Sequence, residues 1–192
     1  MLQPMGHILT GKGIESVADL PALPELYTEP RWYAAYTAPR HEKKIAEQLR
    51  DRSIESFLPL YETMRRWKNG RHKVQLPLFP GYVFVHIPLR EKLSVLKLPS
   101  VVRLVGFNGQ PLPLSDDEVA AIQTCLNRGS KLAPHPFLAV GKRVRIIRGP
   151  LEGLEGIVVR KKSQCRFVIS LELIQRSVAV DVEQDDLFPL NK

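Results

Sequence analysis

Apolar and polar positions follow a period of two in the first ordered stretch of the chain. "RWYAAYTA" (31–38) alternates its aromatic and small side chains, and the aromatic residues favour a strand. The period then lengthens across 39–54, where Ile45 and Leu49 mark one apolar face among charged residues. With Pro39 in a first-turn position, this segment predicts a helix.

Further strands and two more helices follow along the chain. Strand patterns occur at 56–67, 81–87 and 101–107, and helical patterns occur at 90–98 and 115–129. The order β-α-β-β-β-α-β-α implies an antiparallel or mixed sheet with helices packed on it.

Two local signals support these boundaries. Asn69-Gly70 supplies the two positive φ angles of a tight type I′ turn, so residues 65–74 predict a β-hairpin. Ser115 with Glu118 three residues later matches a capping box, which marks the start of the last helix.

Composition divides the chain into two domains. Residues 129–139 combine Gly, Ser and Pro without a period, which is typical of a linker. The segment after it has four or five short strands separated by turn residues, which suits a small SH3-like barrel. We therefore expect an α+β chain with a flexible leader (1–29), an N-terminal domain (30–128), this linker and a barrel (140–190).

The distribution of charged residues limits the possible classes of function. The 192 residues carry a net charge of +8 and the pI is near 9.7, so an anionic partner is expected. Asp116, Asp117 and Glu118 form the one tight acidic group, which suits a helix N-terminus better than a metal or catalytic centre. We therefore expect no catalytic residue, no metal and no cofactor, and no enzymatic activity.

Cysteine use and hydropathy indicate the compartment. Cys125 and Cys165 have neither the CxxC spacing of a zinc site nor the pattern of a disulfide-held secreted domain. No apolar run approaches ~18 residues, and the N-terminal stretch does not match a signal peptide. A cytoplasmic protein without membrane contact is expected.

One segment of the second domain carries a recognisable motif. "VRIIRGPLEGLEGIVV" (144–159) joins two strands through a turn that proline pre-sets and that glycines allow to pack closely. Taken alone, such a turn occurs in many barrels. With its apolar and basic flanks, it resembles the KOW motif of ribosomal proteins and transcription elongation factors. The motif residues are Gly149, Pro150, Gly153 and Gly156.

Several motifs in register extend this resemblance. "RWYAAYTAPRHEKKIAEQL", "PLFPGYVFV", "VVRLVGFNGQPLPLSDDEV" and the KOW segment occur in the order and spacing of the NusG family, over about residues 30–188. "PLFPGYVFV" after a basic hairpin also resembles specialised antiterminator paralogues such as RfaH and the polysaccharide-operon antiterminators. So does "LELIQRSVAV" (171–180), where general NusG carries Phe-Gly-Arg.

The resemblance implies an NGN domain followed by a KOW domain, in a bacterial elongation and antitermination factor that is a monomer. The NGN domain would bind RNA polymerase over the clamp helices of the β′ subunit and promote processive elongation. The family's apolar docking cavity maps onto Tyr36, Phe79, Pro80, Tyr82, Phe84, Phe107, Val119 and Ile122. For Phe84 and Phe107, ordinary core packing is an equal alternative.

Basic residues in two segments are the candidate nucleic-acid contacts, with non-template DNA as the expected strand. The candidates are Arg40, His41, Lys43, Lys44, Arg65, Arg66, Lys68, Arg71 and Lys73. Each cation near a phosphate adds salt-dependent affinity without base specificity. The alternatives are a solvated hairpin that protects a sheet edge and, for Trp67, packing under its own hairpin instead of stacking on a base.

The KOW domain is expected to bind a second partner. In NusG it binds a small-subunit ribosomal protein or Rho through an aromatic loop, whose positions here are Leu173, Ile174 and Arg176. The His-Thr-Thr with which RfaH contacts the polymerase gate loop has no counterpart at residues 91–94, so that contact is not expected.

A rival hypothesis is a KOW-type RNA or ribosome binder that never contacts polymerase. Its positive charge would concentrate in the C-terminal domain. Residues 31–92 instead carry 13 Lys and Arg against 6 Asp and Glu, whereas residues 139–192 carry 10 against 7. The charge distribution therefore disfavours this rival.

Overall fold

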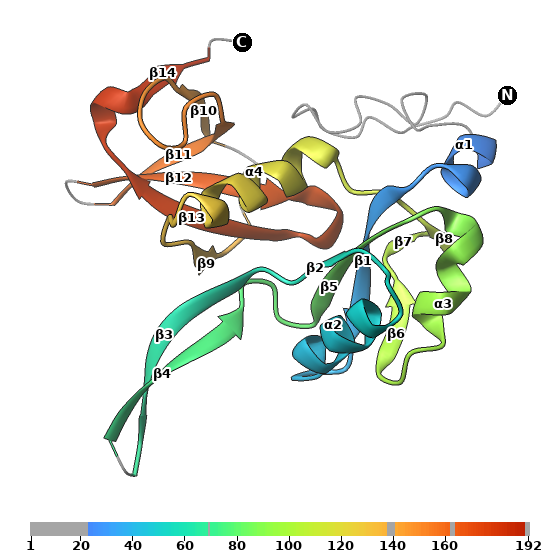
Figure 1. Ribbon diagram of the computed structural model, residues 1–192. Helices are drawn as coiled ribbons and strands as arrows, with labels where there is room; N and C mark the ends of the chain where they lie inside the picture. Colours follow the sequence, from blue (N-terminus) through green and yellow to red (C-terminus); the bar gives the residue numbers. More distant parts are fainter. Residues whose placement is uncertain (1–22, 69, 138–140, 162–163, 191–192) are drawn as a thin grey trace, which may run out of the picture.

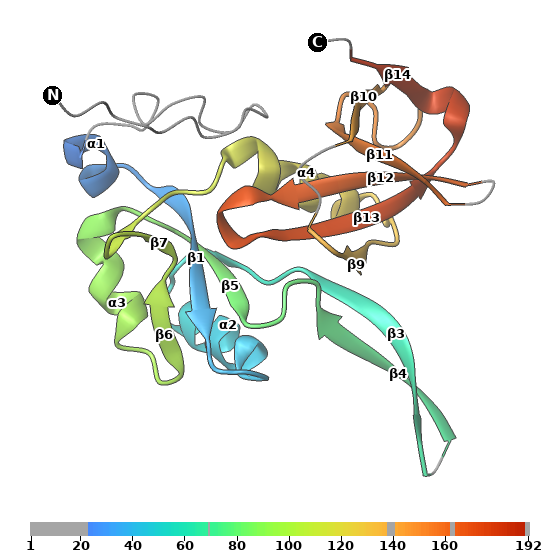
Figure 2. The same ribbon diagram turned by 180° about the vertical axis from the view of Figure 1, so that it is seen from behind.

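The computed structural model describes residues 23–68, 70–137, 141–161 and 164–190. These residues form an α+β domain and a β-barrel, which lie on the two sides of one helix (Figures 1 and 2). Most of the expected leader lies outside the described residues, as does Asn69 of the predicted turn. The end of that leader forms a short helix, although no periodic structure was expected there.

The N-terminal domain is built on a four-stranded antiparallel sheet of order β2-β5-β1-β6, with separate β3–β4 and β7–β8 hairpins. The predicted α+β class is therefore confirmed. The elements are α1 (Leu23–Thr28), β1 (Arg31–Thr37), α2 (Glu42–Asp51), β2 (Ser56–Phe57), β3 (Leu60–Trp67), β4 (Gly70–Pro77), β5 (Tyr82–Ile87), η2 (Leu89–Glu91), α3 (Lys92–Leu96), β6 (Val101–Leu104), β7 (Gly106–Phe107), β8 (Gln110–Pro111) and α4 (Asp116–Asn127).

Local backbone geometry explains where these boundaries differ from the sequence pattern. Helix α2 begins at Glu42 and not at the predicted proline, because Arg40 has a φ of +65°, which a helix does not accept. The strand expected over 101–107 is divided between β6 and β7. At the start of β7 the backbone turns so tightly that a Cβ on Gly106 would lie 1.9 Å from the carbonyl oxygen of Gln110.

The predicted basic hairpin is confirmed as β3–β4. Gly70, which was expected within the turn, instead pairs with Trp67 at the start of β4. Gly70 has a φ of +120°. In both views this hairpin extends away from the rest of the molecule (Figures 1 and 2).

The two faces of the four-stranded sheet pack against different layers. Tyr33 and Val85 lie on the face that packs with α2 and α3, where Ile45 and Leu49 are fully buried. Successive strand residues point to opposite faces, so the neighbouring position Ala34 faces the other way. That second face packs against α4.

The C-terminal domain is a six-stranded antiparallel barrel of order β14-β10-β11-β12-β13-β9. Its elements are β9 (Ala133–His135), β10 (Lys142–Ile146), β11 (Glu155–Lys161), β12 (Gln164–Leu171), η3 (Glu172–Ile174), β13 (Arg176–Val182), η4 (Gln184–Asp186) and β14 (Leu187–Pro189). Strand β9 lies in the predicted linker, which is therefore not wholly irregular. It pairs only with β13, an edge position that tolerates Pro134.

Helix α4 joins the two domains. It contacts β1 of the N-terminal sheet and β12 of the barrel (Figure 1). Ile122 on α4 and Phe167 and Leu171 on β12 are fully buried in one continuous apolar cluster. The two domains that the sequence separates therefore share a core.

Candidate functional site

A row of aromatic rings crosses the face of the N-terminal sheet that packs against α4. Because Ala34 pairs with Phe84, the side chains of β1 and β5 in this row lie on the same face. Neighbouring ring centroids are between 4.9 and 6.4 Å apart, in the stacked, tilted and edge-on geometries that stabilise aromatic pairs. The row consists of Trp32, Phe57, Phe79, Phe84 and His86.

Four of the predicted docking residues are buried in or beside this row. They are Phe79, Phe84, Val119 and Ile122, each of which exposes 1% or less of its surface. They belong to the same apolar cluster as Phe167, Ile169 and Ile174 of the barrel. In this arrangement of the domains, they are core residues.

The row continues toward a partly exposed end. The Tyr36 and Tyr82 rings lie 5.5 Å apart, and the guanidinium carbon of Arg103 lies 5.4 Å from the Tyr36 ring centroid. Both tyrosines are half-buried, and the neighbouring Pro80 is exposed. Arg103 was not among the predicted site residues, although a cation over an aromatic face is a favourable contact.

A buried carboxylate holds the corner that presents Tyr82. The Gly81 N–H donates to Oε1 of Glu42 at 2.7 Å, and the Gly81 carbonyl accepts from the Thr37 N–H at 2.9 Å. Glu42 is only 5% exposed and lies in the first turn of α2, where the helix dipole favours negative charge. Sequence reasoning missed Glu42, because the residue stands in a run of charges that resembles a solvated helix face.

Phe107 does not join the aromatic row. It lies on the β7–β8 hairpin and is 69% exposed. Core packing, the alternative considered for this residue, therefore does not describe it. It is also outside the apolar cluster that holds Phe79, Phe84, Val119 and Ile122.

The predicted nucleic-acid residues are all exposed, at the beginning of α2 and along the β3–β4 hairpin. Of the nine, only Lys73 forms an ion pair with a described residue, 2.5 Å from Oε2 of Glu62. Nδ1 of His41 lies 2.6 Å from Oγ of Ser100, which fixes the imidazole against the loop before β6. Seven of the eight Arg and Lys side chains are therefore not paired with a described carboxylate.

The predicted KOW partner loop faces α4. Ile174 is buried and Leu173 packs against the shared cluster, whereas Arg176 is exposed. The carboxyl group of Glu118 accepts a hydrogen bond from the backbone N–H of Glu172. This contact joins the loop directly to the first turn of α4.

Burial raises the pKa of Glu118 to about 7. The backbone N–H groups of Glu172 and Ser115 oppose this rise, whereas the nearby Glu172 carboxylate adds to it. Burial also raises the pKa of Glu172, and Arg143 opposes that shift. Two carboxyl groups whose ionisation is disfavoured therefore meet where the barrel contacts α4.

Gly149 and Gly153 of the KOW motif lie in the connection between β10 and β11, and Gly156 lies in β11 itself. Gly149 and Gly153 have φ angles of +84° and +90°, which L side chains rarely adopt. Gly156 is required for a different reason, since a Cβ there would lie 2.7 Å from the Phe167 ring. The residues of the predicted motif therefore shape the barrel itself.

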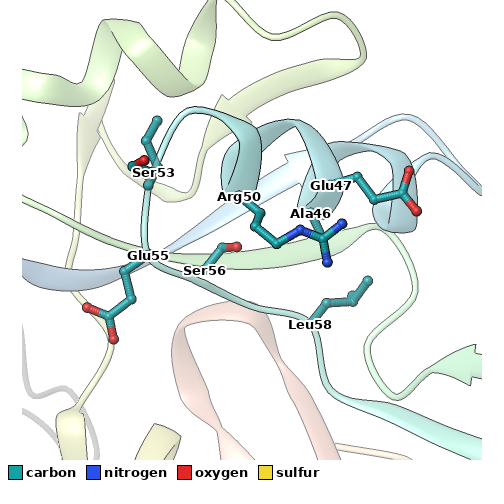
Figure 3. Close-up of a pocket in the computed structure, with 8 residues that line it drawn as sticks. Ala46, Glu47, Arg50, Ser53, Glu55, Ser56 and Leu58 are labelled. Carbon is teal, nitrogen blue, oxygen red and sulfur yellow. The ribbon is translucent and has the colours of Figure 1, made fainter.

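A hollow between α2 and β2 offers no convergent binding groups. Figure 3 shows that the Arg50 side chain extends from α2 across the hollow toward Leu58, while Glu47 and Glu55 point away from it. Ligand sites usually aim a few polar groups at one point.

Among the described residues, no three His, Cys, Asp or Glu side chains are placed to hold a metal ion. No helix that the structure describes, in either domain, is long and apolar enough to span a membrane.

Comparisons with known proteins agree with the motifs. The family model described as NusG, transcription termination factor nusG, matches residues 30–123. The transcription termination/antitermination protein NusG of Helicobacter pylori (strain ATCC 700392 / 26695) is 32% identical over 164 residues, covering 79% of this chain and 93% of that protein. The protein of the same name from Escherichia coli (strain K12) is 29% identical over 168 residues, covering 80% and 92%.

A solved structure is similar in fold. It is described as domain interaction in Thermotoga maritima NusG and superposes with a TM-score of 0.50 at 20% sequence identity. The match covers 86% of this chain and 99% of that one. This likeness supports the arrangement of an α+β domain followed by a barrel.

Proposed function

The chain belongs to the NusG family of transcription factors, and on that basis we propose that its N-terminal domain binds RNA polymerase through the aromatic row and its Tyr36–Tyr82 end. Family members are transcription factors, and we expect no catalysis here. Binding over the β′ clamp helices would favour processive elongation. A specialised, RfaH-like role is part of this proposal, as the resemblance suggests.

The accessible Tyr36–Tyr82 end is the observation that carries the proposal. Tyrosine side chains combine a large apolar area with a polar group, and they are enriched among the residues that dominate protein interfaces. The buried Glu42 carboxylate presets the corner at Gly81, so Tyr82 is held before any partner arrives. Preorganisation of this kind reduces the entropy lost on binding.

The barrel and polymerase would compete for the same surface. Val119 and Ile122 of the predicted cavity are buried in the cluster that includes Ile174 of the barrel. Polymerase could reach them only after the barrel leaves α4. We propose that docking separates the two domains and exposes Leu173 and Ile174 for a second partner.

Binding of the full-length protein to purified bacterial RNA polymerase tests the docking site. Tyr82→Ala is the informative variant, since Phe79→Ala would open a cavity in the core and lower stability by roughly 3–5 kcal/mol. We expect Tyr82→Ala to weaken binding by on the order of 2 kcal/mol, about 30-fold. Phe188→Ala, which removes an exposed aromatic side chain from β14, is the matched control and should bind like the wild type.

Two outcomes would contradict the docking proposal. If neither the wild type nor residues 30–130 alone binds polymerase at low or moderate salt, the KOW-type RNA or ribosome binder becomes the better hypothesis. If Tyr82→Ala and Phe188→Ala bind equally well, polymerase contacts another surface. Thermal denaturation of each variant verifies that the fold is intact.

Amide hydrogen exchange tests the proposed competition between polymerase and barrel. The Glu172 N–H is protected by the Glu118 carboxyl group in the closed arrangement. Saturating polymerase should therefore speed its exchange while the interior of β12 stays protected. Unchanged protection at Glu172 would show that polymerase binds without separating the domains.

A pull-down tests the second partner. Small-subunit ribosomal proteins and Rho are the proposed partners of the loop that carries Leu173, Ile174 and Arg176. Purified ribosomal protein and purified Rho would each be offered to the full-length chain with and without polymerase. Binding that requires polymerase supports the proposal, and no binding to either protein under both conditions rejects this role.

A further inference from the structure

The Arg103 side chain is held at the Tyr36–Tyr82 end by an aromatic ring. Arg103 lies on β6, which in the described part of the chain pairs only with β1. The register places Arg103 opposite Tyr36, so the two side chains share a face of the sheet. The guanidinium carbon lies 5.4 Å from the centroid of the Tyr36 ring. This cation–π contact restricts a long side chain that is otherwise free to take many conformations.

The Tyr36 ring is itself fixed in place. The Tyr82 ring lies 5.5 Å from it at an interplanar angle of 53°. A Cβ added at Gly81 would lie 3.4 Å from Cε2 of Tyr36, so the backbone of this corner lies close to the ring. The same corner is held by the buried carboxylate of Glu42. The fold therefore sets the position of the guanidinium before a partner arrives.

The charge of Arg103 has no counter-ion within the structure. The residue is exposed, and no carboxylate of the described residues forms an ion pair with it. A guanidinium group carries five N–H donors in one plane. The Tyr36 ring accepts none of these as an ordinary hydrogen bond, so the donors remain available to a ligand.

The surroundings of Arg103 suit a protein ligand better than a nucleic acid. Tyr36 and Tyr82 are half-buried, and Pro80 and Val102 are exposed, so apolar and aromatic surface lies beside the cation. Arginine and tyrosine are enriched together among the residues that dominate protein interfaces. In a protein partner, the group that matches a planar guanidinium is a carboxylate, which accepts two parallel hydrogen bonds from it.

We propose that Arg103 binds a carboxylate group of the protein surface that docks on the Tyr36–Tyr82 end. The tyrosine rings contact the apolar part of that surface, and the Tyr36 ring aims the guanidinium at an Asp or Glu beside it. Water excluded by the rings strengthens the ion pair. The proposal rests on the proposed docking of RNA polymerase at this end, and it names the chemistry that the docked surface carries.

This contact also gives the docking site a means of selection. Aromatic rings alone accept many apolar surfaces. A fixed guanidinium rejects a surface that places Lys or Arg opposite it, because like charges would be brought together as water leaves. Arg103 is therefore a specificity-determining residue of the site.

Binding of the full-length protein to purified bacterial RNA polymerase free of nucleic acid tests the proposal. Arg103→Gln removes the charge and should weaken binding by roughly 10- to 100-fold. Arg103→Lys keeps the charge and its contact with the ring but lacks the planar fork, so it should recover only part of that loss. Arg148→Gln removes an exposed arginine from the connection between β10 and β11. It is the matched control and should bind like the wild type.

Two further measurements separate the alternatives. Thermal denaturation of Arg103→Gln and Arg103→Lys verifies that weaker binding does not come from unfolding. The binding series is then repeated with polymerase assembled on a DNA–RNA scaffold. Arg103→Gln should lose affinity by a similar factor with and without the scaffold. A loss that appears only with the scaffold would show that Arg103 binds a phosphate, which contradicts the proposal.

The inference is wrong if Arg103→Gln binds nucleic-acid-free polymerase as tightly as the wild type. It is also wrong if Arg103→Lys binds as tightly as the wild type, since a diffuse positive charge would then be sufficient. If Tyr82→Ala weakens binding and Arg103→Gln does not, this inference fails while the docking proposal stands. If the wild type does not bind polymerase, both fail together.

Discussion

The carboxyl group of Glu118 should make the stability of the closed domain arrangement depend on pH. Its pKa rises to about 7 because it is buried where η3 of the barrel lies against α4. In the unfolded chain it would ionise near 4.5, the ordinary value for this group. Glu118→Gln keeps the size of the side chain and its hydrogen-bond acceptor but removes the ionisation.

The sign follows from proton binding. Between about pH 4.5 and pH 7, the folded protein retains a proton that the unfolded chain has lost, so stability falls as pH rises through that window. One pKa unit corresponds to about 1.4 kcal/mol of free energy. The rise in the Glu118 pKa from 4.5 to about 7 therefore sets the full loss of stability above pH 7 at about 3 kcal/mol. The side chain keeps part of its solvent exposure, which weakens the electrostatic effect, so a loss of about 1–3 kcal/mol is expected.

Thermal unfolding at pH 5 and pH 8 measures this effect. At pH 8 we expect Glu118→Gln to be more stable than the wild type, with a rise in Tm of roughly 2–4 °C per kcal/mol. At pH 5 the two proteins should differ little. Asp117→Asn alters an exposed carboxylate in the same helical turn and should not change the pH dependence. Parallel Tm-against-pH curves for Glu118→Gln and wild type would refute this account of the interface.

Three further predictions concern residues inside the fold. Gly156→Ala should destabilise the barrel by roughly 1–3 kcal/mol in denaturant unfolding, because its Cβ would lie 2.7 Å from Phe167; an unchanged midpoint would contradict this. Glu42→Ala should lower stability by roughly 1–3 kcal/mol because the buried N–H of Gly81 loses its acceptor, and a neutral effect would show that the corner is held otherwise. Cys125, fully buried with a pKa raised to about 11, should react with a thiol reagent at pH 8 only after unfolding.

Regular elements were predictable because their signals are local. Alternation at 31–38, the apolar face of 39–54 and the capping-box pattern at Ser115 each involve a few neighbouring residues. All three correspond to observed elements, namely β1, α2 and α4. Strand β9 was not predictable, because it has no periodic pattern and exists only through pairing with β13, some 40 residues away in the chain.

The candidate site was predictable in composition but not in exposure. The sequence grouped Phe79 and Phe107 as docking residues, yet the first is 1% exposed and the second 69%. Glu42 gave no signal in the sequence, because its role depends on Gly81, which lies 39 positions further along. Arg103 likewise meets Tyr36 only across the pairing of β1 with β6.

The sequence by itself determined the two domains, the basic hairpin, the KOW turn and the family, since each depends on residue types at short, fixed spacing. Only the tertiary structure decided which aromatic rings are buried and that the barrel packs against α4. It also decided that Trp67 is accessible. These properties depend on contacts between segments far apart in the chain, because the burial of a side chain is the sum of such contacts.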